Sequence, residues 1–299
     1  MKALHDVPAP AKLNLFLHVV GKRPDGYHLL QSVFVLIDWA DKLHFDRRDD
    51  GQLRRHDLGP KLPDDDLCLR AARLLQQYSG CAFGADIHID KRLPAGAGMG
   101  GGSSDAATVL LALNRLWGLK LPRKNLLELG LRLGADVPFF LGGQNAFVEG
   151  IGEVLHPLEL PELQFAVLKP SASIATSQIF SSQLLQRSES MAIVAGFPAH
   201  ADLGKSFDPY DGRNDLQKAA EAACPEVAQA LSMLNKKFGN SRMTGSGSAV
   251  FAVVGGKDGD KGILSQAMAT ILRDAPEGWL GEICRSLSRH PLVGWVEDS

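Results

Sequence analysis

The stretch LPAGAGMGGGSSDAA, residues 93–107, is the densest group of residues suited to binding a charged ligand. Five of the seven residues from 96 to 102 are glycine, and two serines and an aspartate follow them. Glycine lacks a Cβ atom, so it adopts positive φ at little cost and lets a ligand touch the backbone. Bare N–H groups that lead into a helix N-terminus attract anions. The pattern therefore predicts a phosphate-binding loop.

Several kinds of phosphate loop have glycines at similar spacing. Gly96, Gly98 and Gly101 fit G-x-G-x-x-G, yet the acidic residue expected about 20 positions later is missing. The P-loop of NTPases has a lysine after its last glycine, where this chain has Ser103. A protein-kinase loop requires an H-R-D string downstream, which the sequence lacks. A turn that only packs two elements is the structural alternative, but five glycines cost more chain entropy than packing requires.

Reactive side chains also stand at two other places. Residues 11–20 alternate as a strand, and one of its faces is predicted to hold Lys12, Asn14, Phe16 and His18. Two polar residues at this spacing favour a shared polar pocket over a lysine that only extends toward solvent. Asp136 follows a helix stop in GADVP, where a carboxylate can accept a proton from a hydroxyl group or simply cap a turn. The residues alone leave both roles of Asp136 open.

The elements that position these residues follow from periodicity and from helix and strand boundaries. The predicted strands are 11–20, 33–48, 85–93, 145–150 and 165–170, with a strand-like tail from Trp279. The predicted helices are 67–79, 104–117, 124–134, 214–223, 225–238 and 261–272. The charged segment 46–57 is expected to be a solvated hairpin, 186–212 a loop, and 242–254 a glycine turn that leads into a strand. Helices and strands mix without a regular βαβ order, which favours an α+β fold with two domains, 1–160 and 161–299.

Composition narrows the class of partner. Net charge is −2 over 299 residues and no basic stripe stands out, which argues against nucleic acid as the main partner. The four cysteines are scattered without metal-ligand spacing, as in a protein of the reducing cytoplasm. No apolar run approaches the ~20 residues needed to span a bilayer, so a membrane partner is not expected.

Taken with the other blocks, the glycine loop resembles that of the GHMP kinases. The stretches AKLNLFLHVVGKRPDGYHLLQS, GADVPFFLGG and RMTGSGSAVFAVV match further blocks of the family in the same order, from Pro10 to Val254. The combination of PAKLNL, DGYH and GADVP is similar to members that act on a small cytidyl diphosphate substrate. The resemblance implies ATP- and Mg²⁺-dependent transfer of phosphate to an alcohol, directly and in a cleft between two domains. Residues 1–160 would bind the nucleotide and residues 161–299 would form the substrate side.

The resemblance also implies roles for individual residues. Asp136 would be the base and Lys12 would orient the acceptor hydroxyl. Tyr27 would stack on cytosine, and His28 would hydrogen-bond the edge of that base. The other expected substrate contacts are Asn14, Phe180, Thr244 and Gly245. The expected nucleotide contacts are Pro94, Ala95, Gly96, Ala97, Gly98, Met99, Gly100, Gly101, Gly102, Ser103 and Ser104, the two serines being candidates for phosphate or Mg²⁺ while the metal ligands stay unassigned.

Two departures and two alternatives accompany this hypothesis. The family commonly has Asn where this chain has Asp66, near the adenine, so purine contacts there are expected to differ. Asp105 stands where some relatives have Asn or Ala, and it is expected to face away from phosphate or to help hold Mg²⁺. A mevalonate or homoserine type of kinase is one alternative, against which DGYH argues. A nucleotide-binding regulator without catalysis is the other, against which Lys12 and Asp136 argue.

Overall fold

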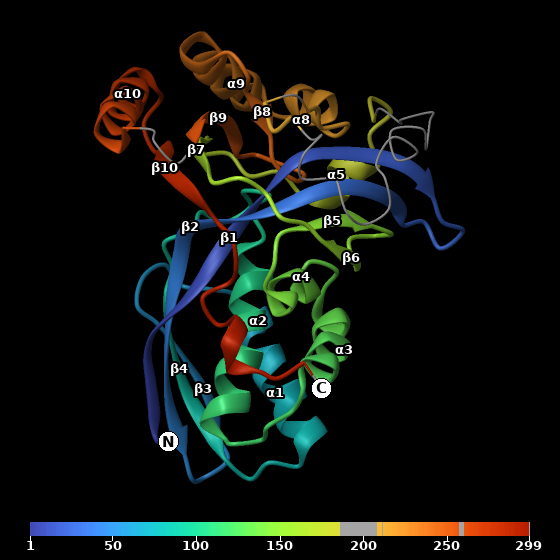
Figure 1. The fold of residues 1–299 in the computed structure, drawn as a ribbon, viewed down its shortest axis with the longest axis vertical. Coiled ribbons are helices and arrows are strands. Elements are labelled where there is room, and N and C mark those ends of the chain that lie inside the picture. The colour runs from blue at the N-terminus through green and yellow to red at the C-terminus, as the bar shows by residue number, and fades with distance from the viewer. Residues whose placement is uncertain (186–207, 211, 257–259, 299) are drawn as a thin grey trace.

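The computed structural model describes residues 1–185, 208–210, 212–256 and 260–298. Two long antiparallel strands, β1 (Ala3–Lys22) and β2 (His28–Arg48), run most of the length of the molecule (Figure 1). The other strands are β3 (Leu53–Asp57), β4 (Gly84–Asp90), β5 (Ala146–Glu149), β6 (Val154–Pro157), β7 (Leu163–Lys169), β8 (Arg242–Met243), β9 (Val250–Gly256) and β10 (Leu280–Leu287). The helices are α1 (Leu67–Ser79), α2 (Gly101–Leu116), α3 (Arg123–Leu133), α4 (Val137–Gly142), α5 (Thr176–Phe180), α8 (Gln217–Ala223), α9 (Pro225–Phe238), α10 (Lys261–Asp274) and the 3₁₀ turn η1 (Val293–Trp295).

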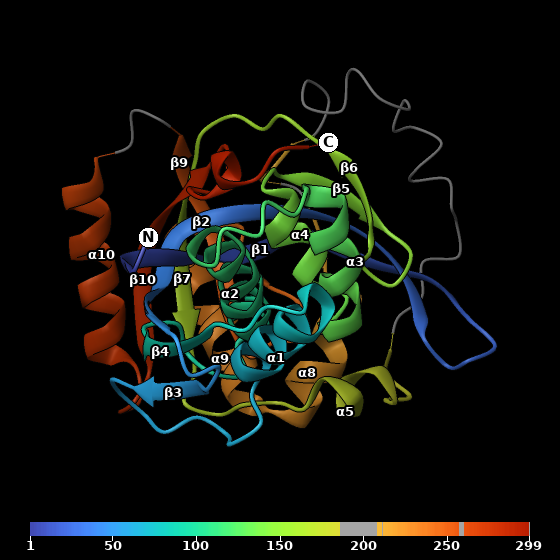
Figure 2. The ribbon, with the colours of Figure 1, turned by 90° about the horizontal axis from the view of Figure 1, so that it is seen from below.

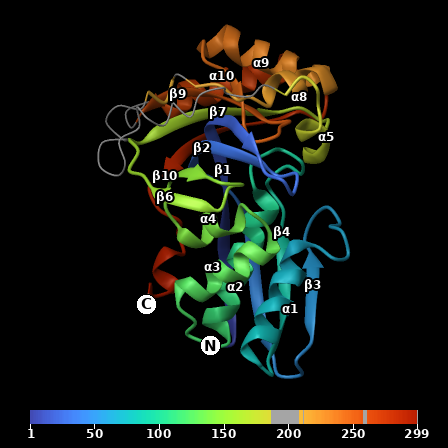
Figure 3. The same ribbon diagram turned by 90° about the vertical axis from the view of Figure 1, so that its right-hand side faces the viewer.

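Strand pairing joins both parts of the chain into one sheet. Its order is β3-β4-β2-β10-β7-β9-β8, and β1 and β5 also pair with β2. Helices α1 to α4 gather around the half that contains β3 and β4, whereas α8 to α10 gather beyond β7 and β9 (Figure 3). Seen from below, α1 and α2 lie in front of the strands and α8 and α9 behind them (Figure 2). The mixed α+β prediction is confirmed. The division at residue 160 stays a prediction.

Within the described residues three hydrophobic cores result, and β1 contributes to all of them. Val7 and Ala9 pack in the core under α1 to α4, and Leu13 in a central core between β1/β2 and β7/β9. Leu17 and Val19 pack in the core under α8 to α10. One strand therefore delivers side chains to both groups of helices and to the space between them.

A bulge corrects the predicted alternation of β1. The register between β1 and β2 shifts between Asn14 and Leu17, because one strand has an extra residue there. As a result Phe16 packs in the same core as Leu13 and Leu15, which the strict alternation had placed on the opposite face. Lys12 and Asn14 precede the bulge and keep their predicted common side. The irregularity lies next to the polar residues of the strand.

Two predicted elements differ in the structure. Residues 46–57 are not a hairpin, because β3 pairs in parallel with β4, and β4 lies between β3 and β2. The helix expected from residue 104 begins at Gly101, with Gly100 as its N-cap at φ +70°. The helices predicted at 67–79 and 225–238 have those bounds. Most of the loop expected at 186–212 lies outside the described residues. Among the described helices, none combines the length and the apolar character needed to cross a membrane.

Candidate active site

A cleft of about 960 Å³ lies where the glycine loop meets β1, the 25–28 turn and the start of α5. Its walls include the whole of residues 94–103, the polar pair Lys12 and Asn14, and Asp136. At one end it is lined by Tyr27, His28 and Phe180, and it also includes Leu62, Pro63 and Asp66. The structure thus brings most of the predicted site residues to a single cavity. Ser104 and Thr244 are the two that do not line it.

The glycine loop turns its carbonyl groups away from the cleft. Every carbonyl from Ala95 to Gly100 accepts a hydrogen bond from the protein, at 2.9 to 3.4 Å. In chain order the donors are Ser173 Oγ, Ser248 N, Ala249 N, Thr244 Oγ1, Lys12 N and Ser104 N. Within the described part of the chain the N–H groups from Gly96 to Ser103 have no acceptor. Such a row of unpaired donors suits phosphate oxygens.

The second glycine turn, within residues 242–254, packs against this loop. A Cβ atom on Gly98 would lie 2.3 Å from the carbonyl oxygen of Thr244, and one on Gly245 would lie 2.6 Å from the carbonyl oxygen of Gly98. Both glycines have positive φ, +71° and +54°. The two turns therefore touch backbone to backbone, which no other residue type allows at either position. Thr244 is buried and ties β1 to the loop, since its hydroxyl accepts from Asn14 N at 3.0 Å.

The first turn of α2 completes the anion cradle. Because the helix begins at Gly101, the N–H groups of Gly101, Gly102 and Ser103 lack partners within the helix. Ser103 lines the cleft. Ser104 is fully buried, and its hydroxyl donates to the carbonyl of Pro10 at 2.6 Å. The two serines thus have different surroundings: Ser103 is open to a ligand, whereas the Ser104 side chain fastens the helix to β1.

Lys12 and Asp136 meet at the middle of the cleft. The Lys12 ammonium lies 3.7 Å from the Asp136 carboxylate, donates to Asn14 Oδ1 at 2.6 Å, and lies 4.2 Å from the ring centre of Phe34. Asp136 is the N-cap residue of α4, but its side chain makes no capping hydrogen bond in the described structure and is about one-third exposed, at 34%. Its carboxylate is therefore open to the cleft, as a proton acceptor requires.

Burial sets the electrostatics of Lys12. Removal of the ammonium from water lowers the pKa of Lys12 below its ordinary value, and the Asp136 carboxylate opposes this shift. Asn14 is itself buried and donates through Nδ2 to Ser32 Oγ at 2.9 Å, so its Oδ1 is held toward Lys12. The fold thus fixes a cation beside an exposed carboxylate.

Aromatic side chains form the far end of the cleft. Tyr27 is 60% exposed at the tip of the β1–β2 turn. The rings of His28 and Phe180 stack on each other, with centroids 5.2 Å apart and an angle of 23° between them. Leu17 and Leu30 line the same region. A flat base can stack on such rings while polar atoms bind its edge.

Asp105 does not face away from the phosphate site, which corrects one of the two expectations for this residue. Its carboxylate lines the cleft and accepts from the Lys91 ammonium at 2.8 Å, and Lys91 also pairs with Asp41. Asp41 in turn accepts from the backbone N–H groups of Arg92 and Leu93, at 2.6 and 2.7 Å. Burial, opposed by Lys91 and reinforced by Asp41, raises the pKa of Asp105 to about 7. This cluster joins β2, the start of the glycine loop and α2.

Sequence reasoning missed several residues of the cleft. Lys91 is one of them: it stands two residues before the stretch 93–107, a position from which a lysine can reach the first turn of α2. The hydroxyl groups of Thr176 and Ser246 lie 2.8 Å apart and line the cleft where α5 meets the second glycine turn. Ser246 lies within the glycine turn of RMTGSGSAVFAVV, whereas Thr176 belongs to no pattern with a chemical signature, so only the fold could place Thr176.

One cleft holds backbone N–H groups that can bind an anion, a lysine–carboxylate pair and an aromatic end. This combination defines a phosphotransferase for a small molecule. Comparison with known proteins agrees. The model of the GHMP kinases N terminal domain matches residues 66–144, and that of the GHMP kinases C terminal domain matches residues 200–269. The chain belongs to the GHMP kinase family, and it is an ATP-dependent phosphotransferase with an alcohol acceptor.

The individual relatives make the assignment more specific. The 4-diphosphocytidyl-2-C-methyl-D-erythritol kinase of Methylibium petroleiphilum is 59% identical over 296 residues, 99% of each chain. The kinase of the same name from Paracidovorax citrulli is 54% identical and covers 100% of this chain and 99% of its own. A crystal structure of 4-(cytidine 5'-diphospho)-2C-methyl-D-erythritol kinase is 32% identical, has a TM-score of 0.74, and covers 93% of this chain and 98% of that one. A homoserine kinase from Cytophaga hutchinsonii, 16% identical with a TM-score of 0.71, shares the fold.

Proposed function

We propose that this protein transfers the γ-phosphate of ATP to the 2-hydroxyl of 4-diphosphocytidyl-2-C-methyl-D-erythritol, a step of non-mevalonate isoprenoid biosynthesis. The relatives that bear this activity in their names match the chain from end to end. The single observation that supports it most is the position of Lys12 and Asp136 in the same cleft as both the anion cradle and the aromatic end. An alcohol bound between the anion cradle and the aromatic end would lie next to both the phosphate donor and the base.

The residues of the cleft support direct transfer to the acceptor without a phosphoenzyme. The N–H groups of residues 96–103 and the N-terminus of α2 hold the triphosphate and stabilise its charge. Asp136 accepts the proton of the attacking hydroxyl, and Lys12 holds that hydroxyl and favours its alkoxide form. Positioning and charge stabilisation are the main demands of phosphoryl transfer.

Mg²⁺ is the expected companion of ATP. Across the described residues no group of three or more His, Cys, Asp or Glu side chains could hold a metal, which suits an ion bound mainly by phosphate oxygens and water. The Ser103 hydroxyl at the first turn of α2 would add a protein ligand. The ion would supply charge neutralisation on the transferred phosphate.

At the acceptor end, Tyr27 and Phe180 would bind the cytosine ring through their faces, and His28 would bind its polar edge. Gly245 lines the cleft and would contact substrate through its backbone, whereas Thr244 would act through the loops it holds. The nucleotide side would lie in residues 1–160, with residues 161–299 closing the cleft. All four cysteines are unpaired, which supports a place in the reducing cytoplasm.

An acceptor assay tests the proposal. Purified protein is given ATP and Mg²⁺ with the cytidyl substrate, mevalonate or homoserine, and ADP formation is followed. The proposal predicts turnover with the cytidyl substrate at least about a hundredfold above the other two, because only that acceptor fills the aromatic end. Preference for mevalonate or homoserine would move the protein to another branch of the family. ADP binding with no turnover on any acceptor would support the regulator instead.

A further inference from the structure

The carboxylate of Asp41 is fully buried on β2, and three donors that precede or begin the glycine loop bind it. Its Oδ1 accepts from the backbone N–H groups of Arg92 and Leu93 at 2.6 and 2.7 Å. Its Oδ2 accepts from the Lys91 ammonium. A buried carboxylate is costly unless such donors compensate for the lost water. These contacts therefore fix the path of the chain where it leaves β4 and enters the loop.

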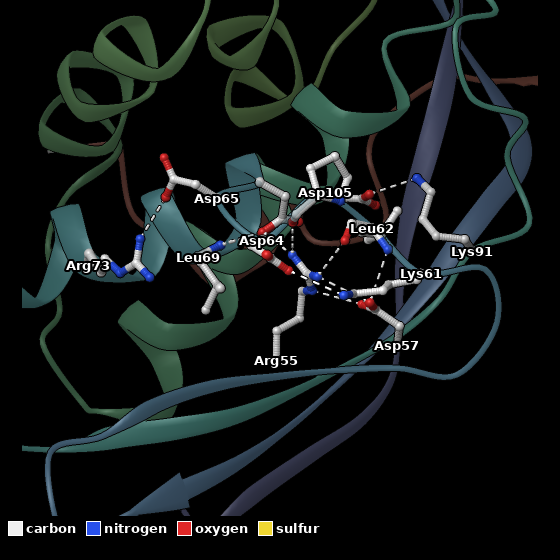
Figure 4. A network of polar contacts seen from close by, with 12 residues as sticks. Arg55, Asp57, Lys61, Leu62, Asp64, Asp65, Leu69, Arg73, Lys91 and Asp105 are labelled. Carbon is white, nitrogen blue, oxygen red and sulfur yellow. Dashed lines mark hydrogen bonds and ion pairs between the residues drawn. The ribbon is translucent and has the colours of Figure 1, made fainter.

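Lys91 carries this link to the other end of the loop. Its ammonium also donates to Asp105 Oδ2 at 2.8 Å, although the two residues are 14 positions apart in the chain. Figure 4 shows Lys91 directed at the Asp105 carboxylate. Burial opposes the Lys91 cation, but the charges and hydrogen bonds of Asp105 and Asp41 outweigh burial and raise the pKa of Lys91. The ammonium thus stays charged at neutral pH and joins the entry of the loop to the start of α2.

The first residue of α2 packs on the segment that Asp41 holds. A Cβ atom on Gly101 would lie 3.5 Å from the Leu93 Cβ and 3.6 Å from the Lys91 ammonium. The carbonyl groups of residues 95–100 are bound by donors on other parts of the chain, none of which, among the donors described above, lies on β2. Asp41 therefore adds a separate hold on the loop, from the strand beside its entry.

Electrostatics alone would disfavour a second carboxylate at this place. Asp41 and Asp105 bring two negative charges, against the one positive charge of Lys91, to the side of a cleft that is proposed to bind phosphate. Like charges repel, so the Asp41 carboxylate by itself weakens the attraction for an anion. Holding the backbone can offset that repulsion, because N–H donors stabilise phosphate best when their positions are fixed before it binds.

We infer that Asp41 is a positioning residue for the phosphate-binding loop, which it holds beside α2 through the three donors that it binds. Asp41 itself is not among the described residues that line the cleft. It would therefore act through the loop, and its loss should affect the binding of the nucleotide phosphates rather than the acceptor end. The inference rests on the proposed use of the glycine loop to hold the triphosphate of ATP.

Asp41→Asn tests the inference, because charge and positioning make opposite predictions for it. Asparagine can keep Oδ1 on the two backbone N–H groups, but its amide then faces the Lys91 ammonium and breaks that contact. Removal of a negative charge near a phosphate site would by itself strengthen ADP binding. Loss of positioning should instead weaken ADP binding about tenfold or more, measured by calorimetry without an acceptor. Binding as tight as in the unmodified protein, or tighter, would overturn the inference and leave the kinase assignment intact.

Asp90→Asn is the matched control. Asp90 is the last residue of β4, and its Oδ2 accepts from Arg92 Nε at 2.8 Å, so it binds the side chain of Arg92 and not the backbone. This variant removes the same charge from a neighbouring position without releasing the loop, and ADP should bind no more weakly than before. An equal loss of ADP affinity in Asp90→Asn and Asp41→Asn would contradict a specific role of Asp41.

Steady-state kinetics separates positioning from a general loss of structure. Asp41→Asn should raise the KM for ATP about tenfold, while the KM for the acceptor stays within about twofold. A protein that is only less stable would lose active enzyme, and hence apparent kcat, at unchanged KM values. A rise of both KM values by the same factor would also overturn the inference.

Hydrogen exchange of the unmodified protein gives a measurement that needs no variant. If the contacts of Asp41 favour nucleotide binding, then by linkage the nucleotide must favour those contacts. Saturation with ADP is therefore expected to slow exchange of the Arg92 and Leu93 N–H groups. Exchange of these two groups at an unchanged rate would overturn the inference. Failure of the unmodified protein to bind ADP would instead overturn the proposed function.

Discussion

The ammonium group of Lys12 lies 3.7 Å from the carboxylate of Asp136, although the two residues are far apart in the chain. Lys12 is buried on β1, whereas Asp136 is partly exposed between α3 and α4. The unequal burial gives the two groups different surroundings: the lysine is fixed by the fold, and the carboxylate is open to the cleft. The predictions below begin with this pair.

Asp136→Asn should lower kcat at least about a hundredfold, because the amide cannot accept the proton of the attacking hydroxyl. The KM for ATP should change little, and the melting temperature should fall modestly, because asparagine keeps the shape of the side chain but no longer offsets the charge of the buried Lys12. ADP formation with the cytidyl substrate is the measurement. Asp274→Asn, at the end of α10, serves as the control. Turnover equal to that of the unmodified protein would remove Asp136 as the base.

Lys12→Met should abolish measurable turnover and leave the melting temperature equal or higher. Burial lowers the pKa of Lys12, which means that the fold holds the charged form against a desolvation cost. Methionine fills a similar volume without that cost, and the Thr244 hydroxyl, 3.3 Å from Asn14 Oδ1, can turn its hydrogen to that oxygen. Calorimetric melting together with the kinase assay separates the two effects. A marked loss of stability would show that Lys12 is mainly structural.

Tyr27→Ala should raise the KM for the cytidyl substrate about tenfold and leave the KM for ATP nearly unchanged, because Tyr27 lies at the aromatic end only. Loss of an exposed side chain should not affect folding. Tyr78→Ala is the matched control, since Tyr78 is an exposed tyrosine on α1 that does not line the cleft. An equal rise of both KM values would show that the division of the cleft is wrong.

Gly98→Ala should lower both stability and ATP affinity. Alanine at φ +71° costs about 1 kcal/mol, and its Cβ would also collide with the Thr244 carbonyl, 2.3 Å away. Gly118→Ala isolates the first cost, because Gly118 has φ +69° and open space around its Cβ position. Urea unfolding and the KM for ATP are compared in both variants. Similar losses in the two would mean that contact between the glycine turns does not shape the phosphate site.

Stability should fall as the pH drops from about 6.5 to 4, in part because of His290. Burial, reinforced by Arg123, lowers the pKa of His290 from 6.5 to about 4. The unfolded chain therefore binds a proton in this window that the folded protein refuses, so stability rises with pH through it. The full contribution is about 3 kcal/mol. His290→Asn should flatten the pH dependence of urea unfolding, and His5→Asn, at an exposed site with no ion pair in the described structure, should not.

The sequence predicted a feature well where residues close together in the chain determine that feature. Helix α1 has the predicted bounds 67–79, because the N-cap carboxylate of Asp66 and the left-handed Gly80 act within one turn of helix. The run of glycines predicted an anion loop, and in the described structure the N–H groups from Gly96 to Ser103 have no acceptor, because that is a property of the loop itself. Lys12 and Asn14 were expected to share a pocket, and they do.

Pairing over long distances could not be predicted in the same way. The position of β3 beside β4 is set by sheet pairing, which the charged sequence of residues 46–57 does not reveal. Gly101 and Gly102 read as loop residues because glycine is a poor helix former, yet the structure places both in α2. Arg55 and Asp66 come together only through the fold. Arg55 Nη1 lies 3.0 Å from Asp66 Oδ1.

The continuity of β1 and β2 restricts how this enzyme can move. Two-lobed enzymes commonly close over substrates by rotating about a hinge of a few loop residues. Here a hydrogen-bonded ribbon packs into all three cores, so rotation of one lobe against the other would have to bend the ribbon and shear the central core. Closure must then come from parts at its edge, such as the 23–27 turn and the start of α5. Substrate-induced changes are expected to be local, and solution scattering with and without nucleotide should give nearly the same radius of gyration.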